Sequence, residues 1–72
     1  MIFENVTIIG VGLIGGSFAL ALKEQQLAKN IIGVDASEQN IEKALALGLL
    51  DEVLSLEDAV KKSDLIFLQP LQ

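Results

Sequence analysis

The stretch that decides the fold is VTIIGVGLIGGSFALAL, residues 6–22, which carries four glycines within seven positions between two apolar runs. The first run is rich in β-branched residues, which favour strands, and the second has apolar residues at helical spacing. Glycine loses more conformational entropy on folding than any other residue. A strand-to-helix junction so rich in glycine therefore indicates a backbone that bends sharply or is approached closely.

Length and composition limit the fold to one small domain. A chain of 72 residues buries a modest share of its surface and is marginally stable. Its hydrophobic content of 51% and mean hydropathy of +0.54 are high, but no apolar run approaches the roughly 18 residues that span a bilayer. We expect a buried core rather than a membrane segment. No basic region precedes the first apolar run, so we expect no signal peptide and a cytoplasmic location.

The absence of two residue types and the net charge limit the kinds of site and partner that the chain can have. The chain has no cysteine and no histidine, which excludes disulfides and thiolate metal sites and removes the commonest general base. The net charge is −5, and the only adjacent basic residues are Lys61 and Lys62. This charge argues against nucleic acid or an anionic membrane as a partner. We assign no catalytic residue and no metal ligand.

Along the chain, strand-like and helix-like periodicity alternate. Ser37 is a plausible N-cap and Gly48 a plausible helix stop, while the segment Ser55-Leu56-Glu57-Asp58 resembles a capping box. The pattern predicts strands over residues 6–9, 31–35, 53–54 and 64–68 and helices over residues 13 to about 26, 38–47 and 56–62. Such alternation indicates a parallel sheet covered by helices, an α/β fold of βαβαβαβ order.

The glycines at the junction have the spacing of a dinucleotide-binding fingerprint. Gly10, Gly12 and Gly15 form G-x-G-x-x-G, in which the first allows the tight turn, the second lets the backbone approach a pyrophosphate and the third lets helix and strand pack closely. Asp35 lies 20 residues after Gly15 at the end of the second predicted strand, where a carboxylate would accept hydrogen bonds from ribose hydroxyls. The sequence therefore predicts a truncated Rossmann-type domain with the strand order 3-2-1-4.

Each of these signals has a simpler interpretation when it stands alone. A bare glycine fingerprint can be a tight turn without a ligand, and a carboxylate at a strand end is often a turn or capping residue. Gly16 and Ser17 could simply keep one helix face small against the sheet. The dinucleotide interpretation is favoured because the motif follows a strand, opens a helix, lies in a βαβ unit and has its acidic partner at the expected distance.

The charge near Asp35 predicts the choice of cofactor. A carboxylate at this position repels a 2′-phosphate, and the residues just after it, Ala36, Ser37 and Glu38, offer no Arg or Lys to neutralise one. NAD is therefore expected in preference to NADP.

Four segments also resemble a known family. GVGLIGGSFA (residues 10–19), IGVD (32–35), ALGLLDE (46–52) and SDLIFL (63–68) resemble the start of the prephenate dehydrogenases. The resemblance covers residues 5–68. Its G-L-I-G-G-S and G-L-L-D-E segments are more specific than the glycine fingerprint alone.

The resemblance implies an oxidoreductase of tyrosine biosynthesis that oxidatively decarboxylates prephenate to 4-hydroxyphenylpyruvate. In this family Gly10, Gly12, Gly15 and Asp35 match nucleotide-binding positions, with Leu13 and Ile14 near the pyrophosphate. The family's catalytic His and substrate-binding Arg have no counterpart here. Residues 1–72 would then be an incomplete dinucleotide-binding domain that lacks the helical domain for substrate binding and homodimerisation. The chain alone is expected to be inactive and, because residues 64–68 would form a sheet edge, either to self-associate or to be marginally folded.

The end of the chain departs from the family pattern. Residues 68–72 read LQPLQ where the family usually has an Ala-Thr-Pro-like turn near the nicotinamide. A frameshift would account for this, because the codons CTG-CAA-CCC-CTT encode Leu-Gln-Pro-Leu and give Ala-Thr-Pro when read from the G of the first codon. A one-residue deletion or an engineered truncation would account for it as well.

Two other functions remain open at this point. The chain could be a stand-alone module that senses NAD or adenine nucleotides, since it carries no catalytic residue. It could also belong to another dehydrogenase with the same fingerprint, acting on a β-hydroxyacid or an imine. The choice between prephenate and arogenate as substrate depends on residues outside this chain.

Overall fold

The sheet has four parallel strands in the order β3-β2-β1-β4. A computed structural model describes residues 2–68, and for residues 13 and 14 the backbone alone. The elements in chain order are β1 (Phe3–Ile9), α1 (Leu13–Glu24), β2 (Ala28–Val34), α2 (Glu38–Ala46), β3 (Glu52–Val53), α3 (Leu56–Lys62) and β4 (Leu65–Leu68). The predicted fold class and strand order are confirmed. The segment that departs from the family pattern begins at Leu68, and its residues 69–72 lie outside the described residues.

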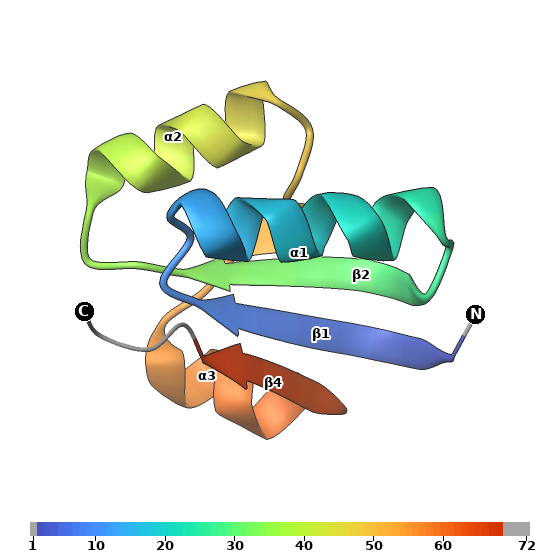
Figure 1. The fold of residues 1–72 in the computed structure, drawn as a ribbon. Helices are drawn as coiled ribbons and strands as arrows, with labels where there is room; N and C mark the ends of the chain where they lie inside the picture. Colours follow the sequence, from blue (N-terminus) through green and yellow to red (C-terminus); the bar gives the residue numbers. More distant parts are fainter. Residues whose placement is uncertain (1, 69–72) are drawn as a thin grey trace.

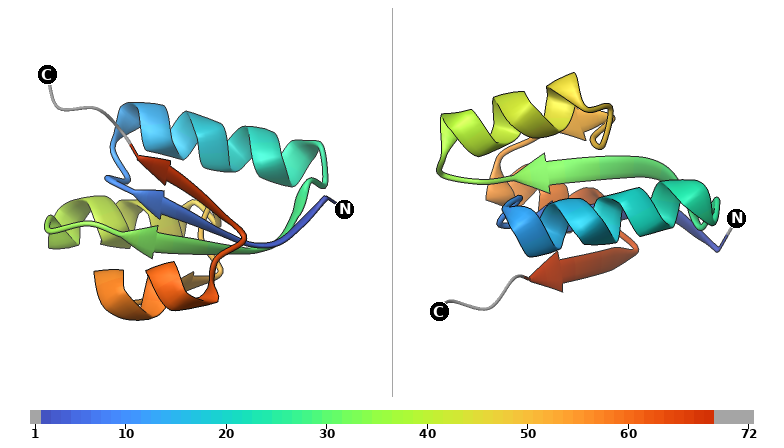
Figure 2. Two further views of the ribbon diagram at one scale, coloured as in Figure 1. Left: turned by 90° about the horizontal axis from the view of Figure 1, so that it is seen from below. Right: turned by 45° about the horizontal axis from the view of Figure 1, so that its top comes forward.

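The helices cover both faces of the sheet. Helix α1 lies against one face and α3 against the other (Figure 2), and α2 lies beside α1 (Figure 1). The carboxyl ends of β1, β2 and β4 meet at one edge of the molecule, where the loop from β1 into α1 begins (Figure 1). This arrangement follows from right-handed βαβ crossovers, which place successive helices where the chain can return to the next parallel strand.

The first two strands are longer than predicted. β1 begins at Phe3 and β2 at Ala28, and these two residues are paired in the register. The added segments contain exposed polar side chains such as Glu4 and Lys29, which interrupt the apolar pattern. Backbone hydrogen bonding between β1 and β2 therefore continues beyond the apolar residues from which these two strands are predicted.

The core is made of the central strands and of apolar residues on the helices, most of them alanines. Its largest fully buried side chains are Ile8, Ile31, Ile32, Val6 and Thr7. The helices contribute Ala19, Leu22, Ala44 and Ala59.

Helix α2 packs on the core through Ile41 and Ala44, which lie one helical turn apart. Leu45 on α2 and Ala21 on α1 are exposed.

The predicted helix caps are present. The Ser37 hydroxyl accepts a hydrogen bond from the Asn40 N–H at 3.3 Å, and the Ser55 hydroxyl accepts one from the Asp58 N–H at 3.2 Å. Gly48 follows α2 with φ +71°, the left-handed conformation that ends a helix at glycine. These local signals act within one turn, so the sequence alone locates them.

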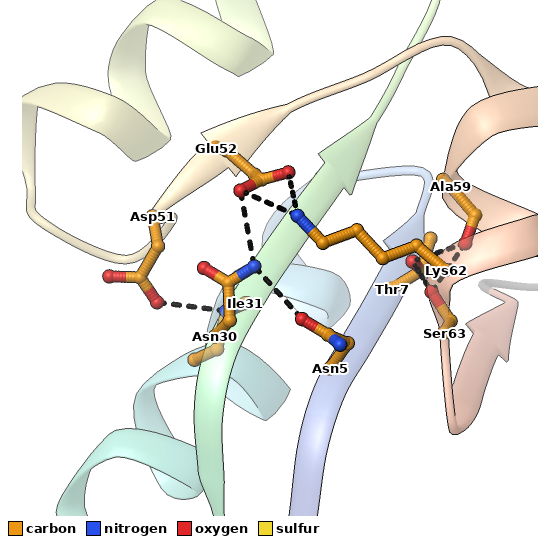
Figure 3. A network of polar contacts seen from close by, with 9 residues as sticks. All are labelled: Asn5, Thr7, Asn30, Ile31, Asp51, Glu52, Ala59, Lys62 and Ser63. Atoms are coloured by element: carbon orange, nitrogen blue, oxygen red, sulfur yellow. Dashed lines mark hydrogen bonds and ion pairs between the residues drawn. The ribbon is translucent and has the colours of Figure 1, made fainter.

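A polar network joins α3 to three strands (Figure 3). The Asn30 amide donates to Asn5 Oδ1 at 3.1 Å and to Glu52 Oε2 at 3.2 Å, and Lys62 Nζ donates to Glu52 Oε1 at 2.9 Å. The hydrogen bond from Lys62, followed by that from Asn30, lowers the pKa of Glu52 below its ordinary value. The network stabilises the packing of α3 and lies away from the glycine-rich loop.

Strand β4 lies at one edge of the sheet. The ring of Phe67 stacks on that of Phe18 from α1, with centroids 4.2 Å apart. Alternate residues of a strand face opposite sides, so Ile66 and Leu68 face the side on which α3 lies, where they are 41% and 65% exposed. Among the described residues, no strand pairs with the outer edge of β4.

Candidate functional site

The loop from β1 into α1 requires glycine at its first position. Gly10 has φ +86°, a conformation that side chains disfavour, and its N–H donates to the Val34 carbonyl oxygen at 2.8 Å. The bond ties the loop to the end of β2. The chain can therefore turn from strand to helix within the residues that precede Leu13.

Gly15 is required for packing. A Cβ at this position would lie 2.5 Å from the Gly10 carbonyl oxygen and 3.1 Å from Ile8 Cγ2. The first contact is with backbone, which cannot rotate away. The predicted role of the third glycine in close helix–strand packing is confirmed.

Gly16 has no such requirement. A Cβ there would meet Leu49 Cδ1 at an ordinary 3.6 Å. The suggestion that Gly16 keeps the helix small against the sheet is wrong, because this position faces the loop that follows α2.

Gly12 is the N-cap of α1, and its backbone conformation does not itself require glycine. Its φ of −89° is open to any residue. The helix has no side-chain cap and no acidic residue in its first turn, so no side-chain carboxylate offsets the positive end of its dipole. Leu13 and Ile14 supply the backbone of that turn, and their side chains lie outside the description. An anion is the natural ligand for such a helix end.

Asp35 joins the glycine-rich loop to the start of α2. Its Oδ2 accepts hydrogen bonds from the Val11 N–H at 2.7 Å and from the Asn40 amide at 3.1 Å. Its Oδ1 accepts one from the Ser37 N–H at 2.8 Å. Asp35 is thus a turn residue as well as a candidate ligand residue, and it lies beside the loop where the fingerprint places it.

The hydrogen bonds of Asp35 keep it ionised. Burial by itself would raise the pKa of this carboxyl group, but the donors from Ser37, Asn40 and Val11 together outweigh it and lower the pKa below the ordinary value. The negative charge is therefore present at neutral pH.

A groove of about 380 Å³ runs between α1 and α2 and reaches the glycine-rich loop. Val11 and Gly12 line it at the loop, Asn40 and Lys43 line it from α2, and most of the remaining lining is apolar. Sequence reasoning missed Val11, Asn40 and Lys43. For Asn40 the sequence does contain a signal. It lies three residues after the predicted N-cap Ser37, and residues three apart on a helix share a face, so Asn40 is placed near the start of α2.

Two other kinds of site are missing from the part of the chain that the structure describes. No cluster of three or more carboxylates could hold a metal ion there. No helix in residues 2–68 has the length and apolarity needed to cross a membrane.

A parallel sheet of this strand order, a glycine-rich loop at a helix start and a carboxylate after the second strand define a dinucleotide-binding domain of the Rossmann type. Residues 18–70 match the family model described as "Prephenate dehydrogenase, nucleotide-binding domain". The chain belongs to this family. The glycine-rich loop precedes the matched residues.

Sequence similarity to characterised proteins supports this assignment. The chain is 45% identical over 49 residues to the prephenate dehydrogenase of Bacillus subtilis, covering 68% of this chain and 13% of that protein. It is 40% identical over 68 residues to the cyclohexadienyl dehydrogenase of Zymomonas mobilis, covering 93% and 23%. The chain thus spans less than a quarter of the length of these relatives.

A solved structure has the same fold. The prephenate dehydrogenase from A. aeolicus, in complex with hydroxyphenyl propionate and NAD+, superimposes with a TM-score of 0.80 at 37% identity. The match covers 90% of this chain and 23% of that one.

Proposed function

We propose that this domain binds NAD(H) as the nucleotide-binding part of a prephenate dehydrogenase. The observation that carries the proposal is the position of the Asp35 carboxylate, 2.7 Å from the Val11 N–H in the loop that opens α1. An acceptor for ribose hydroxyls and a helix N-terminus for phosphate then lie side by side.

In this proposal the pyrophosphate binds over Gly12 at the N-terminus of α1, the positive end of the helix dipole. Gly10 and Gly15 hold the loop in shape, and the backbone of Leu13 and Ile14 lies nearest the phosphates. The Asp35 carboxylate has about four acceptor positions. Three are taken by protein donors, so one ribose hydroxyl can bind without displacing any of them.

The reaction we propose for the whole enzyme is the oxidative decarboxylation of prephenate. A hydride passes from the substrate to NAD+, CO₂ leaves, and the ring becomes the aromatic ring of 4-hydroxyphenylpyruvate. Support comes from the names of the relatives and from the NAD+ in the solved one. This chain contains no histidine, so the catalytic histidine that the family resemblance implies would lie outside it.

We further propose that the whole enzyme is a cytoplasmic homodimer whose helical domain completes the substrate site. The present chain would be its dinucleotide-binding domain in incomplete form. The matched fraction of the relatives, 13% to 23%, supports a further domain of substantial size in proteins of this family.

Asp35 should determine the choice of cofactor. Replacing Asp35 by Ser and Ala36 by Arg removes a negative charge and adds a positive one at the ribose. We expect the ratio of NAD+ to NADP+ affinity to fall by about a hundredfold, or about 2.7 kcal/mol. Calorimetric titration of the wild type and the double variant with both dinucleotides measures this ratio. An unchanged ratio would show that Asp35 does not contact the ribose, and a wild type that binds neither would contradict the proposed function.

The 72-residue chain alone should self-associate and should not turn over prephenate. The outer edge of β4 and the exposed Ile66 and Leu68 form a surface that can pair with a second copy. Light scattering measures the association, and NADH absorbance measures the turnover. Replacing Ile66 by Lys should favour the monomer, because charged residues protect sheet edges. A stable wild-type monomer would contradict the first expectation, and prephenate-dependent NADH formation the second.

A further inference from the structure

Asn40 binds one oxygen of the Asp35 carboxylate from the first turn of α2. Its side-chain amide donates to Asp35 Oδ2 at 3.1 Å, and the Val11 N–H donates to the same oxygen at 2.7 Å. The backbone N–H of Asn40 donates to the Ser37 hydroxyl at 3.3 Å, so the helix cap fixes the point from which the side chain extends. A single carboxylate oxygen thereby joins the glycine-rich loop to α2.

The two oxygens of the Asp35 carboxylate are unequally occupied. Each oxygen can accept about two hydrogen bonds. Oδ2 accepts two, from Val11 and Asn40, whereas Oδ1 accepts one, from the Ser37 N–H at 2.8 Å. The donors within residues 2–68 therefore leave one acceptor position open, and it is on Oδ1.

We propose that Asn40 is a positioning residue for ribose binding, which fills Oδ2 so that Asp35 presents Oδ1 to a single hydroxyl group. The inference rests on the proposed function, which places the adenosine ribose at Asp35. A carboxylate with both oxygens open can bind the two neighbouring hydroxyls of a ribose together. With Oδ2 occupied, the second hydroxyl binds another group or stays in water.

Displacement of the Asn40 amide by the second hydroxyl would bring no net gain. One hydrogen bond to the carboxylate would be exchanged for another, and Asn40, which is half-buried, would lose its partner. Asn40 also lines the groove between α1 and α2 beside Val11 and Gly12, so it is already in place next to the loop. Removing its side chain, by contrast, opens a second acceptor position on Oδ2.

Two analogues of NAD+ test this inference, one without the 2′-hydroxyl and one without the 3′-hydroxyl of the adenosine ribose. One of them should bind the wild type about tenfold or more weakly than NAD+, the loss of a hydrogen bond to a charged acceptor, and the other within about twofold of NAD+. In Asn40→Ala both hydroxyls can reach the carboxylate, so the affinity ratio of the two analogues should fall to about threefold or less. Titration followed by the amide resonances of the isotope-labelled chain measures these affinities and checks folding in the same spectra.

The chain offers a matched control and a second variant. Gln39→Ala removes an exposed amide one residue earlier on α2, and it should leave the affinity ratio of the two analogues unchanged. Asn40→Leu, which is close to asparagine in size and has no donor, should lower the ratio as Asn40→Ala does. It supplies the measurement should the alanine variant not fold.

The outcomes are distinct. If Asn40 were merely structural, its variants would bind NAD+ and both analogues equally more weakly, and the unchanged ratio would overturn the inference. A wild type that loses affinity equally for both analogues, or for neither, would overturn it as well. Absence of NAD+ binding by folded wild type would instead contradict the proposed function.

Discussion

Gly15→Ala should lower the free energy of unfolding by about 3 kcal/mol, the upper end of the usual cost of overpacking a core. The new Cβ would lie 2.5 Å from the Gly10 carbonyl oxygen, so α1 must move away from the loop. A domain of this size has a total stability of roughly 4–10 kcal/mol. Urea denaturation followed by circular dichroism measures the loss, since the chain has no tryptophan or tyrosine.

The next residue provides a control of opposite sign. A Cβ at Gly16 has 3.6 Å to its nearest neighbour, an ordinary contact with Leu49, and alanine is the better helix former. Gly16→Ala should therefore raise the free energy of unfolding by up to about 1 kcal/mol. Equal effects of alanine at both positions would contradict the close contact between α1 and the loop.

Gly12→Val should abolish detectable NAD(H) binding while the domain remains folded. The φ of −89° at Gly12 accepts a side chain, but a branched Cβ would occupy the space through which the pyrophosphate approaches α1. Loss of these contacts should weaken binding at least about a hundredfold, or 2.7 kcal/mol. The wild-type affinity is itself expected to be weak, because the chain presents only the adenosine and pyrophosphate half of the site.

Calorimetry on both proteins measures the effect, with folding checked by circular dichroism. Ala21→Val is the matched control, because it adds the same branched side chain at an exposed position of the same helix. It should leave the affinity unchanged. Equal affinity of wild type and Gly12→Val would remove the nucleotide interpretation of the fingerprint, whereas an unfolded variant would show that Gly12 also has a structural role.

Local signals in the sequence were sufficient to predict the order of strands and helices and to locate the candidate site at the loop between the first strand and the first helix. The caps at Ser37 and Ser55 and the stop at Gly48 depend on atoms within one helical turn, so residue type and spacing reveal them. The spacing of Gly10, Gly12 and Gly15 located the loop. The alternation of strands and helices then left few topologies, because parallel crossovers have a fixed hand.

Only the tertiary structure decided which atoms of distant segments meet. The hydrogen bond from Val11 to Asp35 spans 24 residues of sequence, and the tight contact that separates Gly15 from Gly16 depends on where α1 lies against the loop. The reason is physical: helix and strand periodicities repeat over a few residues, whereas contact, burial and charge pairing depend on positions that the whole packed chain sets.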